Sequence, residues 1–259
     1  MGKIISIVNQ KGGVGKTTTA VNLAASLGAL GCSVLLIDID PQGNATSGLG
    51  INKRTVRRSS YDLIIGEAAF EETVIKTGYK NVSIIPSNID LAGAEIELVS
   101  MDRREYNLRD AIVAHKSSYD YILIDCPPSL ALLTLNGLSA CDTILIPIQC
   151  EYYALEGLSQ LMSTVRQVKR TYNPRIELEG VLITMFDSRL NLTMQVAGEV
   201  KKHFPKKVYS TAIPRNVRIS EAPSYGRPVR YYDGGSKGSS AYDDLAREII
   251  EQNKRMEVE

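Results

Sequence analysis

The sequence is poor in the residues that carry out most acid–base, redox and metal chemistry. It has no tryptophan, only two histidines and four cysteines in 259 residues. The cysteines show no Cys-x-x-Cys spacing, which argues against a zinc site or a redox pair, so we expect them to be buried and reduced. Because histidine is also scarce, any chemistry is expected to depend on lysines and aspartates.

Long apolar runs and a strong excess of charge are absent as well. No stretch of eighteen apolar residues exists, and the N-terminus lacks the basic and then apolar pattern of a secretory signal. We therefore expect a cytoplasmic protein. A length of 259 residues with 44% hydrophobic content fits one domain covering residues 1–259. The net charge of +1 indicates no particular partner by itself.

What the chain does contain is a glycine-rich loop between two regular segments. Residues 3–8 form a short β-branched apolar run, and residues 17–30 have apolar positions at helical spacing. Between them, residues 10–18 read Gln-Lys-Gly-Gly-Val-Gly-Lys-Thr-Thr. Glycines in such a loop let backbone N–H groups turn toward an anion, and the start of the helix adds its positive end. The pattern predicts a phosphate-binding loop.

This loop assigns roles to individual residues. Lys16 is expected on the β- and γ-phosphates of a nucleotide, and the Thr17 hydroxyl on Mg²⁺. Two features depart from the ordinary motif: Gln10 stands where its first glycine is expected, and Lys11 is an additional lysine. The residues expected to contact the nucleotide here are Lys11, Gly12, Gly13, Val14, Gly15, Lys16, Thr17 and Thr18.

Carboxylates follow two further apolar strands. The run at 121–125 ends in Asp125, the form of a Walker B element, whose carboxylate holds the Mg²⁺ shell directly or through water. The run at 33–37 leads into Asp38 and Asp40. Because side chains alternate along a strand, both aspartates are expected on the same side, with one of them facing the γ-phosphate and the attacking water.

The order of the segments predicts an α/β fold. Additional buried-strand patterns lie at 82–86, 143–148 and 178–185, and helical patterns at 90–99, 105–115, 130–139, 152–170, 190–203 and 239–253. Alternating units of this kind predict a doubly wound, mostly parallel sheet flanked by helices, with ligands at the carboxyl ends of the strands. Only residues 42–60 read as loosely structured.

Four separated motifs carry a resemblance to a known family. They span 11–18, 38–43, 125–128 and 147–157, and together they resemble the P-loop ATPases with a deviant Walker A motif known as the ParA family, above all its short chromosomal Soj-type members. The resemblance implies an ATP-dependent switch for chromosome partitioning. ATP would close a homodimer that binds double-stranded DNA without sequence preference, and a ParB-type centromere-binding protein would stimulate hydrolysis to ADP and phosphate. Regulation of replication initiation or sporulation is a further family role.

The resemblance also implies site residues and cofactors. The cofactors are ATP and Mg²⁺, with Thr17 and Asp125 at the metal. Lys11 would reach the phosphates of the partner subunit, and Asp40 would position the hydrolytic water, so that Lys11, Lys16 and Asp40 form the catalytic set. Pro214 and Asn216 align with the segment that holds the adenine.

DNA binding is expected from the surface of the ATPase itself. The predicted first strand begins at residue 3, which leaves no room for an N-terminal helix-turn-helix. Residues 201–230 contain eight lysines and arginines but one acidic residue. Basic residues spread over loops and helices suit phosphate contacts that read no bases, and would associate the protein with the nucleoid. The candidates are Arg189, Lys201, Lys202, Arg218 and Arg227.

Three related functions remain as alternatives. A membrane-cycling, MinD-like protein needs a basic amphipathic C-terminal helix, whereas this chain has two glutamates among its last three residues. An iron–sulfur protein needs cysteines that bridge a dimer. A metabolic ATP-dependent amide ligase needs a pocket for its acceptor.

Overall fold

The computed structural model describes residues 2–258, and these form one seven-stranded sheet in the order β3-β4-β2-β5-β1-β6-β7. Every neighbouring pair is parallel except β3 and β4, so the predicted α/β fold with a mostly parallel, doubly wound sheet is confirmed. The strands are β1 (Lys3–Ile7), β2 (Val34–Asp38), β3 (Ile75–Lys76), β4 (Val82–Ile85), β5 (Tyr121–Asp125), β6 (Thr143–Gln149) and β7 (Glu177–Thr184).

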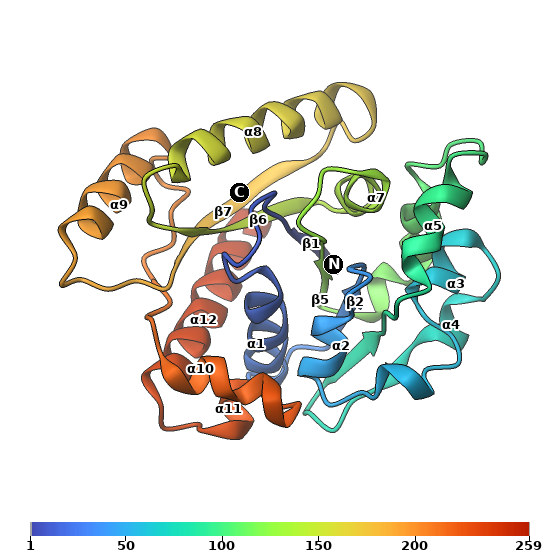
Figure 1. Ribbon diagram of the computed structural model, residues 1–259, viewed down its shortest axis with the longest axis horizontal. Helices are drawn as coiled ribbons and strands as arrows, with labels where there is room; N and C mark the ends of the chain where they lie inside the picture. The colour runs from blue at the N-terminus through green and yellow to red at the C-terminus, as the bar shows by residue number, and fades with distance from the viewer. Residues whose placement is uncertain (1, 259) are drawn as a thin grey trace.

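Helices cover both faces of the sheet (Figure 1). The longer ones are α1 (Lys16–Ala29), α5 (Leu91–Leu98), α7 (Leu132–Ala140), α8 (Ala154–Thr171), α9 (Asn191–His203) and α12 (Lys237–Val258). The shorter ones are α2 (Asn44–Gly48), α3 (Ser60–Ile65), α4 (Phe70–Thr73), α6 (Asn107–Ile112), α10 (Val217–Glu221) and α11 (Val229–Tyr232), with 3₁₀ turns at Lys53–Thr55, Val113–Ser118 and Ala222–Tyr225.

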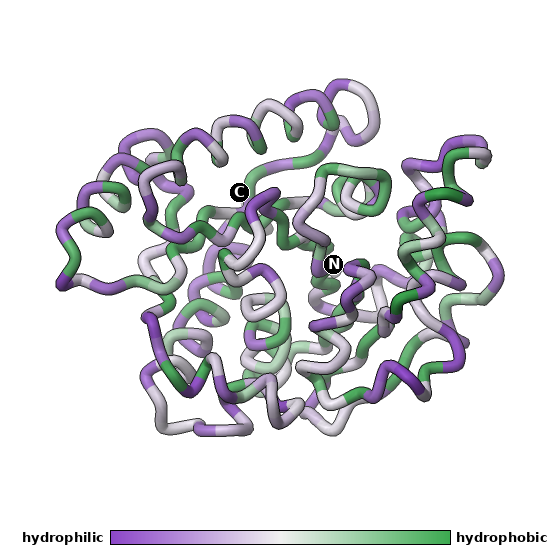
Figure 2. Tube along the Cα trace, viewed as in Figure 1, coloured by the Kyte–Doolittle hydropathy of each residue, from purple (hydrophilic) through white to green (hydrophobic). Residues whose placement is uncertain are grey.

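Two hydrophobic cores lie on opposite faces of the sheet. Alternate residues of β2 enter different cores. Leu35 and Ile37 pack with side chains of α3 and of the helices from α5 through α9, whereas Leu36 packs with side chains of α1, α2 and α12. The central strands are therefore buried on both faces, which explains why they read as continuous apolar runs. Figure 2 shows these apolar residues concentrated in the interior of the trace.

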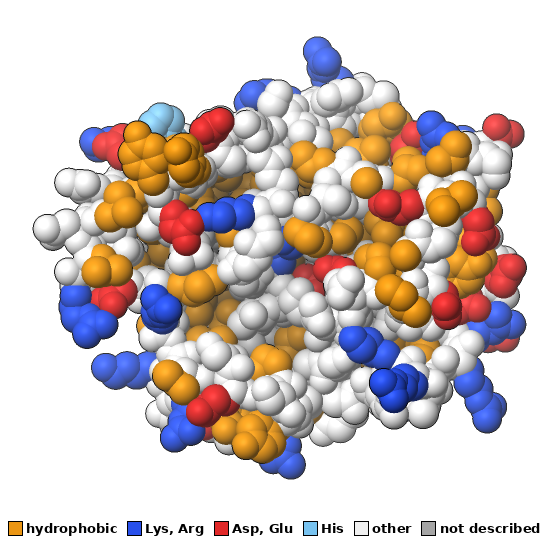
Figure 3. Space-filling view, in the orientation of Figure 1, with side chains coloured by type: hydrophobic (Ala, Val, Ile, Leu, Met, Phe, Trp, Pro, Cys, Tyr) orange, Lys and Arg blue, Asp and Glu red, His pale blue; other side chains and the backbone are white. Residues whose placement is uncertain are grey.

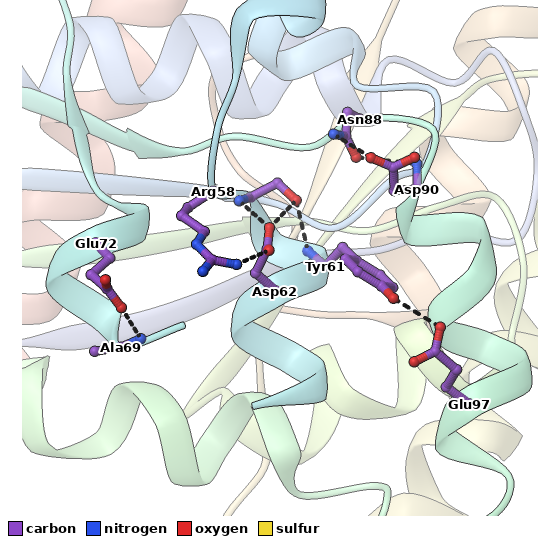
Figure 4. A network of polar contacts seen from close by, with 9 residues as sticks. Arg58, Tyr61, Asp62, Ala69, Glu72, Asn88, Asp90 and Glu97 are labelled. Atoms are coloured by element: carbon purple, nitrogen blue, oxygen red, sulfur yellow. Dashed lines mark hydrogen bonds and ion pairs between the residues drawn. The ribbon is translucent and has the colours of Figure 1, made fainter. Parts of the chain in front are cut away.

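Residues 42–60 are more regular than predicted, and this expectation was wrong. They contain α2 and a 3₁₀ turn, and Ser59 begins α3 with a capping box in which Asp62 accepts from the Ser59 backbone N–H at 2.8 Å. Figure 4 shows this cap and the bond from the Tyr61 hydroxyl to Glu97 that joins α3 to α5. These elements of three to six residues are too short to give a clear hydrophobic period, so the pattern did not indicate them.

Most other boundaries shift by one or two residues, but the last helix ends five residues later than predicted, and the helix predicted at 105–115 is divided into α6 and a 3₁₀ turn. All four cysteines are free; Cys126, Cys141 and Cys150 are buried, while Cys32 is half-buried. Among residues 2–258, no helix is both long and apolar enough to cross a membrane.

Candidate nucleotide-binding site

The glycine-rich loop connects β1 to α1 at the carboxyl edge of the sheet, next to the ends of β5 and β6 (Figure 1). Gly15 directly precedes α1 with a φ of 92°, a left-handed conformation that residues with a Cβ rarely adopt. The Thr184 hydroxyl donates to the carbonyl oxygen of Val14 at 2.8 Å. Gln10, which replaces the usual glycine, donates to the side chain of Gln160 in α8 at 2.7 Å. The loop is thus attached to both β7 and α8.

The two lysines of this loop point in different directions. Lys16 is only 6% exposed, and its ammonium donates to the carbonyl oxygen of Lys11 at 3.0 Å, across the loop. Burial lowers the pKa of Lys16, while the nearby charges of Asp125, Cys126 and Asp40 oppose this change. The Lys11 side chain is 47% exposed and forms an ion pair with Glu151, just before α8. The Lys16 ammonium thus lies within the loop, whereas the Lys11 ammonium is paired with Glu151 outside it.

Asp125 is the most unusual carboxylate of the site. It is completely buried, and neither of its oxygens makes a hydrogen bond of good geometry among the described residues, although the Thr17 hydroxyl lies near enough to interact with it. Burial raises its pKa well above the usual value, and the charge of Asp38 raises it further, while Thr17 and Lys16 act in the opposite direction. A buried carboxylate without partners is costly unless something pairs with it.

These residues fit a magnesium ion. Carboxylate and hydroxyl oxygens are suitable ligands, and Mg²⁺ in nucleotide sites usually takes one or two protein ligands together with phosphates and waters. Thr17 and Asp125 would supply those ligands. Among the described residues, no cluster of three or more His, Cys, Asp or Glu side chains is arranged to hold a metal by itself.

Asp38 and Asp40 lie at the end of β2, and Ile39 between them enters the hydrophobic core. Asp38 is fully buried, and burial raises its pKa to about 6 although hydrogen bonds from Thr46 oppose the rise. One Asp40 carboxylate oxygen accepts from the Gln42 N–H at 2.9 Å. Asp40 is also close enough to Lys16 for its negative charge to raise the pKa of that lysine. The sequence pattern left open which aspartate faces the phosphates. The geometry favours Asp40, because the Asp38 carboxylate accepts hydrogen bonds from the backbone N–H and the hydroxyl of Thr46.

A cleft of about 340 Å³ begins at Gly15 and Thr18 and continues to Pro214 and Asn216, the two residues expected at the adenine. The Asn216 side-chain oxygen caps α10 by accepting from the Arg218 N–H at 2.9 Å. The side-chain NH2 group of Asn216 is therefore the part that can contact a base. Met185 also lines the cleft and has a φ of 49°, uncommon for a residue other than glycine. The sequence did not indicate Met185, because a methionine in a sequence does not reveal that its backbone adopts a positive φ.

The expected DNA-contacting residues lie on two separate elements. Arg189, Lys201 and Lys202 belong to α9 and the loop before it, while Arg218 and Arg227 belong to the segment around α10. In Figure 3, Lys and Arg side chains occur along the left and lower rim, where Figure 1 places these elements. The residues are therefore not one continuous helix face.

Three of these candidates have a carboxylate next to them that offsets their positive charge. Arg189 contacts Asp187 at 2.6 Å, Lys202 contacts Glu199 at 2.6 Å, and Arg218 contacts both Glu221 and Asp233. Over the part of the chain whose side chains are described, no such pair is found for Lys201 or Arg227. Arg227 additionally lines a second cleft with Thr17 and Thr18, which places it near the nucleotide loop.

Comparisons with known proteins show which proteins this chain resembles. Residues 2–178 match the family model described as an AAA domain. The chain is 59% identical to the sporulation initiation inhibitor protein Soj of Bacillus subtilis, over 96% of this chain and 98% of that protein. It is 52% identical to the chromosome partitioning protein ParA of Myxococcus xanthus, over 98% and 89%. A solved structure called cobyrinic acid a,c-diamide synthase from Mycobacterium smegmatis, with bound ADP and magnesium, is 35% identical with a TM-score of 0.86, covering 98% of this chain and 96% of that one.

Proposed function

Because the chain belongs to the ParA/Soj family of chromosome-partitioning ATPases, we propose that it is an ATP-driven DNA-segregation switch that hydrolyses ATP to ADP and phosphate. The observation that carries this proposal is the fully buried carboxylate of Asp125, which the Thr17 hydroxyl and the Lys16 ammonium approach. The buried carboxylate would be stabilised by a bound cation, and the Lys16 ammonium and the loop N–H groups can bind phosphate. The names of the relatives supply the biological role.

In the proposed reaction, this chain contributes positioning and charge neutralisation. The Lys16 ammonium exchanges its bond with the Lys11 carbonyl for phosphate oxygens, and the loop N–H groups hold the remaining oxygens. Thr17 and Asp125 would hold magnesium, which would supply positive charge to offset the charge of the phosphates. Asp40 orients the attacking water. Phosphoryl transfer requires little covalent chemistry from a protein, which is consistent with a site that contains no histidine.

The proposed active form is a homodimer closed by ATP. Lys11 carries an exposed charge at the nucleotide edge but is not directed at the loop of its own subunit. A cation supplied across a dimer would stabilise the charge that develops on the transferred phosphate, as an arginine finger does. This couples hydrolysis to dimerisation, and one subunit by itself holds an incomplete site.

The proposed partners are double-stranded DNA and a ParB-type protein. Arg189, Lys201, Lys202, Arg218 and Arg227 would contact phosphates without reading bases. The ion pairs of Lys202 and Arg218 lie at the exposed surface and are therefore weak, so DNA phosphates can compete with Glu199 and Glu221 for these cations. Arg189 is itself 86% exposed beside the less exposed Asp187. We place this activity in one ATPase domain of residues 1–259, acting in the cytoplasm at the nucleoid.

The decisive experiment measures the ATPase rate with and without random-sequence DNA and a ParB-type protein from the same genome. We expect a slow basal rate, because a switch must persist between encounters, and joint stimulation when both are added. A rate unaffected by either would contradict the proposal. DNA retention that requires ATP and decreases steeply with salt would support the DNA-binding half.

A second candidate is ATP-dependent amide formation, which the name of the Mycobacterium smegmatis structure suggests. An amide ligase activates an acceptor carboxylate with the γ-phosphate, so its ADP release depends on a small acid and an amine donor. The two candidates are separated by adding either DNA or cobyrinic acid with glutamine to the same assay. ADP release that depends on the small molecules, without any response to DNA, would favour the ligase.

A further inference from the structure

A closed ring of hydrogen bonds surrounds the backbone of Asp40, and its members come from three parts of the chain. Asp38 and Asp40 stand at the end of β2, Thr46 lies in α2, and Ser87 lies in the loop that follows β4. Asp38, Thr46 and Ser87 are fully buried. The sequence motifs single out neither Thr46 nor Ser87.

The ring can be followed bond by bond. The Asp40 N–H donates to one oxygen of Asp38 at 3.2 Å. The other Asp38 oxygen accepts from the Thr46 N–H at 2.8 Å and from the Thr46 hydroxyl at 2.7 Å. The Thr46 hydroxyl oxygen accepts from the Ser87 N–H at 2.8 Å, and the Ser87 hydroxyl donates to the Asp40 carbonyl oxygen at 2.7 Å. The ring thus begins and ends on Asp40.

The directions of these bonds leave little freedom. A hydroxyl carries one proton, so the Thr46 proton on Asp38 leaves only a lone pair for the Ser87 N–H. The Ser87 proton is likewise directed to Asp40, because its other neighbour, the Asn88 carbonyl oxygen, is farther away at 3.4 Å. Buried hydrogen bonds of this kind strengthen one another in a medium of low dielectric constant. Both peptide groups that flank the Asp40 side chain are therefore fixed.

The carboxylate of Asp40 is oriented from the same fixed backbone. One oxygen accepts from the Gln42 N–H at 2.9 Å, and the Gly43 N–H donates to the Asp40 carbonyl oxygen at 2.8 Å. Across residues 2–258, no hydrogen bond is found to the second carboxylate oxygen. That oxygen is the one that can accept from a water at the γ-phosphate.

We propose that Thr46 and Ser87 are positioning residues that hold the Asp40 carboxylate in the direction needed to orient the attacking water. This inference rests on the proposed ATPase function, since Asp40 has a water to orient only in a nucleotide hydrolase. A displacement of about 1 Å in a catalytic group can cost on the order of a hundredfold in rate. Two buried hydroxyls bonded to Asp38 and to the Asp40 backbone can therefore influence turnover through Asp40.

Two substitutions at one position separate positioning from packing. Thr46→Val keeps the shape of the side chain but removes the hydroxyl, whereas Thr46→Ser keeps the hydroxyl and removes a methyl group. We expect Thr46→Val to lower kcat about tenfold with an unchanged KM for ATP, and Thr46→Ser to stay close to wild type. The opposite ranking, with valine active and serine impaired, would show that the methyl group matters and would overturn the proposal.

Ser87→Ala provides a second variant if Thr46→Val does not fold. It removes only the hydroxyl that contacts Asp40, while the Ser87 N–H can still donate to Thr46. We expect a similar loss in kcat with the KM for ATP preserved. Full kcat in Ser87→Ala would contradict the inference, and so would a change confined to KM.

Amide hydrogen exchange tests the ring without any hydrolysis. The Ser87 N–H should exchange about tenfold faster in Thr46→Val than in Thr46→Ser, with the strand amide of Ile85 as internal control. Equal exchange in both variants would overturn the ring. The two levels of proposal fail differently: a wild-type protein that hydrolyses no ATP refutes the function, whereas normal hydrolysis in all three variants refutes only the positioning role.

Discussion

Lys11 and Glu151 form an ion pair at the nucleotide edge of the sheet, although they lie 140 residues apart in the sequence. Both side chains are nearly half exposed, so the pair contributes less than about 1 kcal/mol and can be exchanged for another partner. In the single subunit, Glu151 therefore holds the lysine that we propose acts on the partner's phosphates.

Substitutions of this pair should have opposite consequences. Lys11→Ala is expected to bind ATP but remain monomeric, because the cation that crosses the dimer is lost. Glu151→Gln should dimerise with ATP as well as the wild type or a few-fold better, because it frees Lys11 from a weak competitor. Light scattering with ATP distinguishes these results, and dimerisation of Lys11→Ala at the wild-type ATP concentration would remove the proposed cross-dimer role.

Lys16→Ala should abolish nucleotide binding. The substitution removes a buried cation that we propose binds the phosphates, and losing such a partner costs at least about 2 kcal/mol, or about thirtyfold in affinity. Titration calorimetry with ADP and ATP measures the loss. Lys53→Ala is a suitable control, since Lys53 contacts the neighbouring Gln42 carbonyl oxygen but no part of the glycine-rich loop.

Asp40→Ala should separate binding from hydrolysis. ATP affinity is expected to stay within a few-fold of wild type, while kcat falls on the order of a hundredfold because the water loses its orienting group. The ATP-bound dimer should then persist. A normal turnover rate in this variant would refute the role of Asp40, and Asp102→Asn, at an exposed carboxylate, controls for the loss of an acidic charge.

Asp125→Asn should stabilise the nucleotide-free protein in a way that depends on pH. Burial raises the folded-state pKa of Asp125, so the folded protein binds a proton more readily than the unfolded chain. Stability is therefore greatest below the unfolded pKa and is lost as the pH rises through the folded value. Asp38, with a pKa raised to about 6, contributes in the same direction between about pH 4 and pH 6.

Thermal unfolding at two pH values tests this expectation. The Tm advantage of Asp125→Asn over the wild type should be larger at pH 8 than at pH 4, because only the ionised carboxylate is unfavourable. Magnesium with ADP should raise the Tm of the wild type and have little effect on the variant. An advantage that is equal at both pH values would show that the buried charge is not its cause.

Charge removal on the α9 and α10 surfaces should weaken DNA retention without affecting dimerisation. Reversing Arg189 or Arg218 to Glu is expected to reduce ATP-dependent retention of random DNA, and Lys76→Glu is the matched control, since β3 is at the opposite edge of the sheet from β7. For Arg218→Ala, the salt dependence of log K should become shallower by about one. An unchanged slope would mean that Arg218 contacts no phosphate.

Local sequence determined the strands, the glycine-rich loop and the carboxylates that follow β2 and β5. These features depend on short-range rules: alternation along a strand, helical spacing, and the freedom of glycine to expose N–H groups. The positions of Lys16, Thr17 and Asp125 followed because parallel strands bring their carboxyl ends to one edge of the sheet.

Tertiary structure alone decided which partners these residues meet. The bond between Thr46 and Ser87 joins residues 41 apart, and the pair of Lys11 with Glu151 joins residues 140 apart. Threonine, serine and glutamate are common surface residues, so nothing in their local sequence distinguishes a buried ring from an exposed loop. The sequence alone identified the groups that can bind a nucleotide, whereas packing between distant elements determined which of them are free, which are held in place, and which face outward.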